Sequence, residues 1–473
     1  MSDRLTEELS KIAAEHGAVG FGVGGVEPFD RERQALRARI ESGMSGPLRF
    51  TYRDPDLATD VTGAFPWARR LVTVAFDYLP SSRAPAESGA VVGRFATADH
   101  YQGLRRITAE LMTRLFDRGY QAAALIDDNR LVDRAAAVRS GVGWSGKSTM
   151  TLVPGRGPWV LLGSVVTDAP LDLSAPLSRT CGTCIACIPA CPTGALTEIG
   201  LDARRCLSTW LQTAGSIPHW IRPVLGRRIY GCDDCLAACP PGRRAMESSS
   251  PNTDSLPFAE LLASTDDALL ERFRWWYVPR RDGRYLRRNL LVAAGNSGEP
   301  GARGPIEDHM RHPSSMIRSH AAWALGRSLG IGAAPILRSA LAGETAPETR
   351  EELSLALLMV EDPSAHRTVL AADEWARGNA SVRGVALVVA DLARPGDGVA
   401  LHLVGGVLPG RPSGGRPLPI EVDADAGEIR DRSATDGEVI RVYDPDHLLR
   451  SRAGKVRPGR AFSSDRRSRP RPV

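Results

Sequence analysis

The sequence predicts an α/β domain, then a cysteine-rich segment, a set of helical repeats and a tail of irregular composition. Three observations predict this order. Residues 1–175 alternate between helix-like and strand-like stretches, all eight cysteines lie between Cys181 and Cys239, and helix-length units recur between residues 285 and 372. Because alternating helices and strands are typical of α/β domains, we expect one at the N-terminus.

The elements of this first domain follow from the spacing of its apolar residues. Helical periodicity covers "RLTEELSKIAAEHG", "RERQALRARIESGM" and "LRRITAELMTRLFDRG". Runs rich in β-branched and aromatic residues predict strands at "VGFGVGGV", "RRLVTVAFDYL", "YQAAALID" and "PWVLLGSVVTD".

The composition is that of an ordinary globular protein. Of the 473 residues, 42% are hydrophobic and 24% are charged, which suffices for several domains with their own cores. No run of about 18 apolar residues and no export leader is present, so we expect a cytoplasmic monomer with no membrane segment. The net charge is +5, and arginines concentrate after residue 220, which favours an anionic partner.

The stretch "GVGWSGKS" matches two nucleotide-binding motifs, G-x-x-x-x-G-K-S and G-x-G-x-x-G. Both motifs need a strand directly before the glycines and a helix directly after them. Here the preceding "LVDRAAAVRS" has helical character, and the following residues are strand-like. We therefore interpret the glycines as tight backbone turns, with Lys147 able to face an anionic group.

Residues 176–245 have the cysteine spacing of a bacterial two-cluster ferredoxin. "CGTCIACIPACP" is a C-x2-C-x2-C-x3-C-P run, and the lone Cys206 precedes a second run, "CDDCLAACP". In such proteins the fourth cysteine of a run ligates the other cluster. The spacing thus predicts two [4Fe–4S] clusters, with structural zinc as the alternative. The predicted ligands are Cys181, Cys184, Cys187 and Cys239 for cluster 1, and Cys191, Cys206, Cys232 and Cys235 for cluster 2.

Residues 246–374 are predicted to be helical. The units "YLRRNLLVAAGN", "MIRSHAAWALGRSLG" and "TREELSLALLMV" resemble a short HEAT-like solenoid, with three ordinary core helices as the alternative. Residues 375–473 are rich in Gly, Pro and Arg and lack steady periodicity, so we expect this tail to be disordered.

The segment "RFRWWYVPRRDGRYLRRN" combines arginines with aromatic residues, and "IRPVLGRRIYG" adds more arginines. Arginines position phosphates and aromatic rings stack on unpaired bases, so these segments predict an RNA surface. A packed aromatic edge with solvated arginines is the alternative. The candidate contacts are Arg222, Arg227, Arg228, Arg280, Arg281 and Arg287.

Five stretches, in this order, resemble the cobalamin-dependent epoxyqueuosine reductases of tRNA modification. They are "IDDNRLVDRAAAVRSGVGWSGKSTM", "LLGSVVTDAPL", "CGTCIACIPACPTGAL", "IYGCDDCLAACP" and "RRNLLVAAGN…SHAAWALGR". The resemblance implies base-off cobalamin on the N-terminal domain, two [4Fe–4S] clusters beside it, and helical repeats that contact tRNA. It further implies reduction of epoxyqueuosine to queuosine at the wobble position, with electrons from an external flavodoxin or ferredoxin.

Asp127 matches the catalytic aspartate of that family. Deoxygenation of an epoxide takes two electrons and two protons, so an acid beside the corrin would serve as proton donor. An ordinary Asp, with a pKa of about 3.9, is ionised at neutral pH, so burial must raise its pKa. A helix cap is the structural alternative. The resemblance also implies cobalamin contacts from Lys147, Ser148, Thr151, Leu162, Asp233 and Asp234.

The chain departs from the family pattern at four places. Arg130 replaces a usual proline and Ser145 a large apolar residue, and two tripeptides also differ. These tripeptides are Leu211, Gln212 and Thr213 in place of T-I-E, and Pro240, Pro241 and Gly242 in place of P-W-N. The departures bear on the identity of the substrate. Two other classes of function stay open, namely a cobalamin reductase of small molecules, such as a reductive dehalogenase, and a non-catalytic electron carrier or RNA-binding scaffold.

Overall fold

The computed structural model describes residues 2–247, 252–254 and 256–363, together with short strands further along the chain. The chain divides into two compact units. The first comprises Met1–Ile217 and Ile221–Ala302, and the second comprises Pro218–Trp220 and Arg303–Val473.

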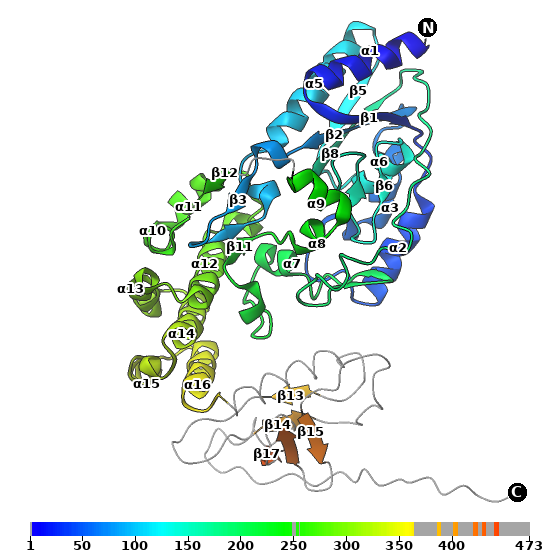
Figure 1. The fold of residues 1–473 in the computed structure, drawn as a ribbon. Helices are drawn as coiled ribbons and strands as arrows, with labels where there is room; N and C mark the ends of the chain where they lie inside the picture. Colours follow the sequence, from blue (N-terminus) through cyan, green and yellow to red (C-terminus); the bar gives the residue numbers. More distant parts are fainter. Residues whose placement is uncertain are drawn as a thin grey trace, which may run out of the picture. The chain divides into compact units, whose positions relative to one another are not determined.

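The first unit is built around a four-stranded sheet with the order β1-β2-β8-β5 (Figure 1). The strands are β1 (Ala18–Gly24), β2 (Arg70–Asp77), β5 (Ala122–Leu125) and β8 (Val160–Thr167). All neighbours run antiparallel, and Val72 lies opposite both Val23 and Val165. The predicted strands are confirmed. Their antiparallel arrangement could not be read from the alternating pattern, which is more often seen with parallel sheets.

Helices cover both faces of this sheet. α1 (Ser2–Glu15) and α5 (Tyr101–Asp117) lie side by side on one face, as Figure 1 shows. α5 buries Leu104, Ile107, Leu111 and Leu115, which recur at helical spacing and form one apolar stripe. α6 (Asp133–Arg139) packs on the other face, in a cluster that includes Phe65, Leu125 and Leu131. The Asp127 segment lies between β5 and α6.

The stretch "GVGWSGKS" belongs to a β-hairpin. β6 (Trp144–Ser145) pairs with β7 (Thr151–Leu152), and the chain continues into strands, not into a helix. Gly143 packs so closely that a Cβ atom would lie 2.6 Å from the carbonyl oxygen of Leu152. Glycine is therefore needed for backbone packing, which agrees with the interpretation of this stretch as tight turns.

The first unit also contains shorter elements. Its other helices are α2 (Asp30–Glu41), α3 (Pro55–Thr59), α4 (Val61–Ala64), α7 (Leu207–Gln212), α8 (Asp234–Ala237), α9 (Pro240–Glu247), α10 (Phe258–Ala263), α11 (Asp266–Arg272) and α12 (Arg284–Ser297). Its paired strands are β3 (Arg83–Pro85) with β12 (Asn252–Asp254), β4 (Val91–Val92) with β11 (Arg228–Tyr230), and β9 (Leu196–Thr197) with β10 (Gly200–Leu201). The helices α10–α12, predicted as part of the repeat domain, therefore group with the first unit.

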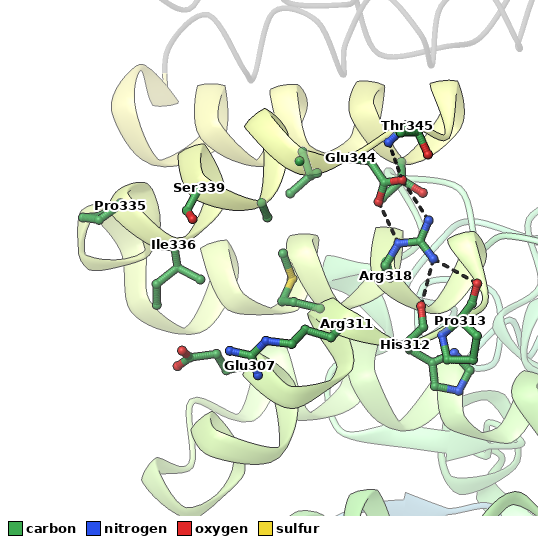
Figure 2. Close-up of a pocket in the computed structure, with 15 residues that line it drawn as sticks. Glu307, Arg311, His312, Pro313, Arg318, Pro335, Ile336, Ser339, Glu344 and Thr345 are labelled. Atoms are coloured by element: carbon green, nitrogen blue, oxygen red, sulfur yellow. Dashed lines mark hydrogen bonds and ion pairs between the residues drawn. The ribbon is translucent and has the colours of Figure 1, made fainter.

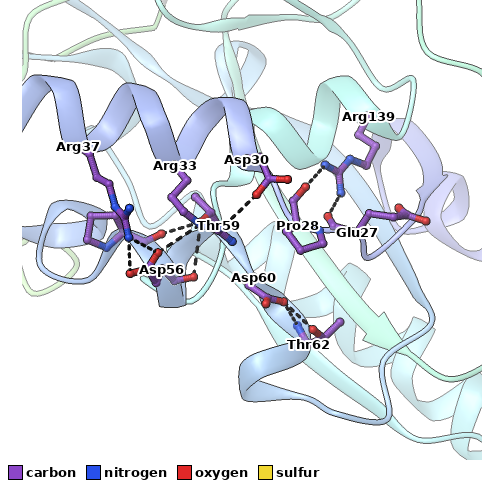
Figure 3. Close-up of polar contacts among 11 residues, drawn as sticks. Glu27, Pro28, Asp30, Arg33, Arg37, Asp56, Thr59, Asp60, Thr62 and Arg139 are labelled. Carbon is purple, nitrogen blue, oxygen red and sulfur yellow. Dashed lines mark hydrogen bonds and ion pairs between the residues drawn. The ribbon is translucent and has the colours of Figure 1, made fainter.

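Arginine side chains fasten the segment that follows β1 (Figure 3). Arg33 and Arg37 of α2 both reach Asp56 of α3, at 3.3 and 2.8 Å. Arg139, at the end of α6, donates to the carbonyl oxygens of Glu27 and Pro28. The exposed ion pairs contribute at most about 1 kcal/mol each, so their main effect is on the path of the chain.

The second unit contains α13 (Arg303–Asp308), α14 (Ser315–Leu329), α15 (Ala334–Gly343) and α16 (Pro347–Glu361). The helices predicted from the repeated units are confirmed as α12, α14 and α16. The tail contributes the strands β13 (Ala386–Val388), β14 (Leu401–Val404), β15 (Ile420–Asp423), β16 (Glu428–Asp431) and β17 (Val439–Tyr443). The rest of the tail, for which we predict disorder, lies outside the described residues. No helix in the described part of the chain is long and apolar enough to cross a membrane.

Candidate active site

The eight cysteines are free thiols carried by turns and short elements of the first unit. The run from Cys181 to Cys191 lies in consecutive turns. In the second half, Cys206 directly precedes α7, Cys235 lies within α8, and Cys239 lies between α8 and α9.

Among the four thiols predicted for cluster 1, the charges of some raise the pKa values of others. Burial raises the pKa of Cys239, and the charges of Cys181, Cys187 and Cys184 raise it further. Burial, followed by the charges of Cys181 and Cys184, also raises the pKa of Cys187. The charges of these thiols act on one another, which is compatible with the set predicted for cluster 1.

The other four thiols form a second group. Burial raises the pKa of Cys235, and the charges of Cys232, Cys206 and Cys191 add to the effect. Burial raises the pKa of Cys232 to about 12, with smaller contributions from Asp234 and Cys206. A thiol with so high a pKa stays protonated unless a metal replaces its proton. These charge effects link the thiols of the set predicted for cluster 2, and both crossed ligand sets stay predictions.

Nitrogen donors beside these thiols suit iron–sulfur clusters. Trp144 packs with Cys239 and Cys181, and its Nε1 atom is buried without a hydrogen-bond partner. The backbone N–H groups of Lys147 and Ala195 lie 3.4 and 3.2 Å from the Sγ atoms of Cys181 and Cys191. Donors of this kind bind cluster sulfur and influence its reduction potential. Among the described residues, no group of three or more His, Cys, Asp or Glu side chains is arranged to hold a single metal ion.

Asp127 has a strained backbone. It lies two residues beyond the end of β5, with a φ of 50°. A positive φ is uncommon for a residue with a side chain and costs about 1–3 kcal/mol, and it is often associated with function. The side chain reaches solvent, yet enough protein surrounds the carboxyl that burial raises its pKa.

The pKa values of Asp127 and the adjacent Asp128 are shifted in opposite directions. The charge of Asp128 is the second cause, after burial, of the raised pKa of Asp127. Arg130 holds the pKa of Asp128 below its usual value, chiefly through hydrogen bonds, with Nη2 2.6 Å from Asp128 Oδ2. The pair therefore combines an acid that retains its proton more strongly with a fixed negative charge. This contact also gives a role to Arg130, one of the departures from the family pattern.

The charge of Asp127 contributes to the raised pKa values of three further ionisable groups. Burial raises the pKa values of Tyr101 and Tyr230 well above the usual range, and Asp127 contributes to both shifts. Burial raises the pKa of Asp133 to about 8, with Asp127 as the second cause, and Asp133 Oδ1 is buried without a hydrogen-bond partner. Because Tyr230 stands two residues before Cys232, this acidic group borders the second cysteine set.

The six residues predicted to contact cobalamin are packed against, or hydrogen-bonded to, other parts of the protein. Ser148 and Thr151 are buried, and Leu162 packs against a core cluster. The other three have polar partners: Lys147 Nζ donates to the Gly182 oxygen at 2.9 Å, Asp233 accepts from the Arg94 N–H at 2.7 Å, and Asp234 pairs with Arg228 at 2.7 Å. Lys147 thus supports the first cysteine loop, and no anion is needed to explain its position.

Two of the predicted tRNA contacts are contradicted by burial. Arg222 is 1% exposed and Arg287 is 5% exposed. Arg222 Nε donates to the carbonyl oxygen of Ile217 at 2.8 Å, and Arg287 Nε lies 2.7 Å from Asp266 Oδ1. Both guanidinium groups bind protein oxygens inside the first unit and are not available to phosphates.

The other four predicted arginines differ in accessibility. Arg227 and Arg228 are half-buried; the first donates to the carbonyl oxygens of Gly89 and Ala86, and the second pairs with Asp234. Arg280 and Arg281 are exposed and lie in the 3-10 turn Pro279–Arg281. Both have positive φ, 54° and 51°. Arg281 donates to the carbonyl oxygens of Leu270 and Trp276, so Arg280 is the more accessible cation.

Most aromatic rings of this segment are internal. Trp276 stacks on Phe273 at 3.9 Å and on Tyr230 at 4.3 Å between ring centroids. Tyr277, by contrast, is 46% exposed and meets Phe50 edge to face at 5.1 Å. The packed-edge interpretation therefore holds for Phe273 and Trp276, while Tyr277 and Phe50 present rings to solvent.

The second unit has a cavity of about 690 Å³ among α14, α15 and α16 (Figure 2). Arg318 crosses it, with Nε 2.6 Å from Glu344 Oε2, and also donates to the carbonyl oxygens of His312 and Pro313. The guanidinium group lowers the pKa of Glu344 to about 2. These contacts join α14 to the loop before α16 and leave Arg318 fully engaged.

Sequence reasoning missed three residues. Asp133 is the last acid of "DDNRLVD" and could have been noticed from that spacing. Trp144 was placed only in a glycine-rich turn. Arg288, in a basic run, is fully buried and donates to the carbonyl oxygens of Trp210 and Thr213, which follow Cys206. Nothing in the sequence marks it as internal.

Comparisons with known proteins match this geometry. Residues 180–242 match a model described as a 4Fe-4S double cluster binding domain, and residues 280–357 match HEAT repeats. An epoxyqueuosine reductase of Alicycliphilus denitrificans is 31% identical over 362 residues, which are 69% of this chain and 99% of that protein. One from Vibrio cholerae is 30% identical over 68% of this chain and 91% of that protein. The chain belongs to the epoxyqueuosine reductase family.

Solved epoxyqueuosine reductases have the same fold. One, crystallised with an epoxyqueuosine-modified stem loop of tRNA-Tyr, is 27% identical, with a TM-score of 0.69 over 76% of this chain and 99% of that one. Another, from Bacillus subtilis, has its catalytic aspartate loop swung out of the active site; it is 26% identical, with a TM-score of 0.66 over the same shares.

Proposed function

We propose that this protein reduces epoxyqueuosine to queuosine at the wobble position of tRNA. The observation that carries the proposal is the Asp127 site, where an acid with a raised pKa and a strained backbone borders the second cysteine set. The named relatives, and a similar structure with an epoxyqueuosine-modified stem loop, support an RNA substrate over a small molecule or a purely electron-carrying role.

Two [4Fe–4S] clusters would be held by the crossed cysteine sets. The mutual charge effects within each set and the unpartnered Trp144 Nε1 support this assignment. The first set includes the exposed Cys184, whereas the second adjoins the buried Tyr230 and, through it, the Asp127 site. Electrons would therefore pass from the first cluster to the second and then to the active site.

The reaction fixes what the site must supply. Conversion of an epoxide into an alkene breaks two C–O bonds, releases the oxygen as water and consumes two electrons and two protons. Cobalamin, when bound, would supply the reduced cobalt that delivers the electrons to the substrate. Asp127 and the unpartnered Asp133 Oδ1 offer two carboxyl groups to a polar ligand at this end of the sheet. The proposed cobalamin contacts are Ser148, Thr151, Leu162 and Asp233.

Asp127 would hold a proton on its carboxyl group and donate it to the epoxide oxygen. An unprotonated oxygen is a poor leaving group, so a general acid contributes about 10²–10⁴-fold to the rate. The raised pKa keeps the acid protonated to a higher pH; burial is its main cause, and the charge of Asp128 adds to it. The aspartate of the Bacillus subtilis enzyme lies on a loop that can leave its active site, and Asp127 here occupies a strained loop between β5 and α6.

The anticodon loop would bind beside the exposed turn of Arg280. Arginine holds phosphates and an exposed ring such as Tyr277 stacks on an unpaired base, while the modified base must leave its stack to react. An external flavodoxin or ferredoxin would supply the electrons to a monomeric enzyme. Three other arginines would stabilise this surface through their bonds to the protein. Arg281 and Arg227 bind backbone carbonyl oxygens, and Arg228 binds the carboxylate of Asp234.

The test is anaerobic turnover of tRNA that carries epoxyqueuosine, with nucleoside mass spectrometry of the product. The protein loaded with clusters and cobalamin should form queuosine, and Asp127→Asn should retain both cofactors but lose turnover by about 10²–10⁴-fold. Asp117→Asn, the same change at an exposed position on α5, is the matched control. Loss of epoxyqueuosine without queuosine, or normal turnover by Asp127→Asn, would contradict the proposal.

A further inference from the structure

The surface above the first cysteine set has an unusual composition. A hollow of about 470 Å³ opens there, lined by Trp144, Gly155, Arg179, Thr180, Pro241 and Arg244. Two of these six residues are arginines and none is acidic. Both arginines are exposed, and so are the neighbouring Lys147 and Arg243.

The wall of the hollow leads directly to the thiols. Trp144 packs with Cys239 and Cys181, and the guanidinium group of Arg179 lies over its ring at 5.6 Å from the centroid. A single indole therefore separates the arginine at the surface from two ligands of the first set. The buried Nε1 of Trp144 has no hydrogen-bond partner, as expected for a donor that faces cluster sulfur.

The first cysteine loop begins at the rim of the same hollow. Thr180 lines the hollow, and the chain then runs through the exposed residues Gly182 and Cys184 to Ile185, which is 50% exposed. Lys147 fixes this loop through its bond to the Gly182 oxygen. An exposed apolar residue on a loop that starts beside two arginines and is held by a lysine suits a short-lived protein contact, since such contacts combine a small apolar centre with charged surroundings.

We propose that the hollow around Trp144, Arg179 and Arg244, with the adjoining loop up to Ile185, is the docking surface for an acidic one-electron carrier protein. The proposal rests on the proposed function, because it supplies the electrons that the reaction consumes. In each encounter the reduced carrier loses one electron and the oxidised first cluster gains it. Two encounters supply the pair of electrons needed for one epoxide.

The position of this surface beside the first cysteine set favours such a carrier over RNA. The arginine pair is continuous with the thiols of the first set, whereas the strained Arg280 turn and Tyr277 lie in a separate segment near the second set, as the contact of Tyr230 with Trp276 shows. Weak redox complexes bury little area and depend on electrostatic steering, which raises association rates by about 10–10³-fold at low salt.

The experiment measures binding and reduction separately, with a bacterial flavodoxin as the probe. Calorimetry with oxidised flavodoxin gives the affinity without turnover, and stopped-flow absorbance with its hydroquinone form gives the rate of cluster reduction. Arg179→Ala/Arg244→Ala should weaken binding about tenfold and slow reduction about 10- to 100-fold at low salt, with a much smaller effect at high salt. Arg179→Lys/Arg244→Lys should retain most of both.

Two controls separate the possible failures. Reduced methyl viologen, a small cation, should reduce all variants at the same rate and to the same extent, and should support normal turnover. Arg31→Ala/Arg106→Ala removes the same charge from exposed positions on α2 and α5 and should leave flavodoxin binding unchanged.

Normal reduction of the double alanine variant by flavodoxin would overturn the proposal. Loss of tRNA stem-loop binding in that variant, with flavodoxin reduction intact, would assign the surface to RNA instead. If flavodoxin docking responds as expected but no variant forms queuosine with either reductant, the docking surface stands and the proposed function fails.

Discussion

Replacement of Arg280 by glycine should stabilise the protein and weaken its binding to tRNA. Arg280 has φ 54° and ψ 17°, which is left-handed backbone that costs a residue with a side chain about 1–2 kcal/mol. Its side chain is exposed, and the turn is held instead by Arg281, which binds the carbonyl oxygens of Leu270 and Trp276. Glycine relieves the strain without the loss of a packing contact.

The gain is partly offset in the unfolded chain. Glycine adds backbone freedom there, worth about 0.4–1 kcal/mol, so Arg280→Gly should gain at most about 1.6 kcal/mol, or about 3–6 °C in the unfolding midpoint of a large domain. Arg280→Ala keeps the strain and should show no gain. Because both variants lose the same guanidinium group, their difference in stability reports the strain less the backbone freedom that glycine adds to the unfolded chain.

Both variants should lose the same amount of tRNA affinity. One lost phosphate contact reduces the salt slope by about 0.7–0.9. Between 50 and 200 mM salt, that change corresponds to about a threefold smaller loss of affinity than in the wild type. Anisotropy of a labelled anticodon stem loop across this range measures the slope, and thermal melting of the cluster-loaded protein measures stability. An unchanged slope in both variants would refute the phosphate contact, and a glycine variant that melts below the alanine variant would refute the strain.

Three other changes test the rest of the structure. Asp133→Asn should stabilise the protein increasingly as pH rises from about 4 to 8, because the Asp133 carboxyl keeps its proton up to a pKa of about 8 in the folded chain but loses it near 3.9 in the unfolded chain. The largest gain in unfolding free energy at pH 7 is about 4 kcal/mol. An equal difference in melting temperature at pH 5.5 and pH 8 would contradict this prediction. Cys191→Ser should remove the same cluster as Cys235→Ser and leave about four iron atoms per chain. Cys187→Ser should likewise remove the same cluster as Cys239→Ser. If the spectra show that Cys191→Ser and Cys187→Ser remove the same cluster, the crossed ligand sets are wrong. Arg288→Met should cost about 3–5 kcal/mol in melting experiments, since it strands the buried carbonyl oxygens of Trp210 and Thr213, and a stability within 1 kcal/mol of wild type would show that these oxygens find other partners.

The sequence was most informative where the determinants are local. The apolar residues of α5 recur every three or four positions, so its helix and buried stripe could be predicted. Cysteine spacing likewise predicted two thiol groups, because a metal cluster restricts which short loops can surround it. The order and direction of the strands in the central sheet depend on pairings between residues up to about a hundred positions apart, and no local pattern encodes them.

Burial of charged residues was the main feature that could not be predicted. Arg287 and Arg288 stand in the same basic run as Arg280, and their composition suggested a solvated face. The partners that enclose them come from other segments: Leu262 and Asp266 bind Arg287, and Thr213 binds Arg288. An arginine becomes internal when backbone oxygens surround its five donors, and the sequence does not show where those oxygens will lie.

The Asp127 site combines local and distant determinants. The order of residues places Asp127, Asp128 and Arg130 in one short loop, where the arginine binds the carboxylate of Asp128. That contact keeps Asp128 ionised, and its charge then raises the pKa of Asp127. Burial is the larger cause of the raised pKa of Asp127, and the distant residues Tyr101 and Tyr230 lie within reach of its charge. A proline at position 130, usual in the family pattern, has no side-chain donor for Asp128, so Arg130 adds an ion pair beside the acid in this chain.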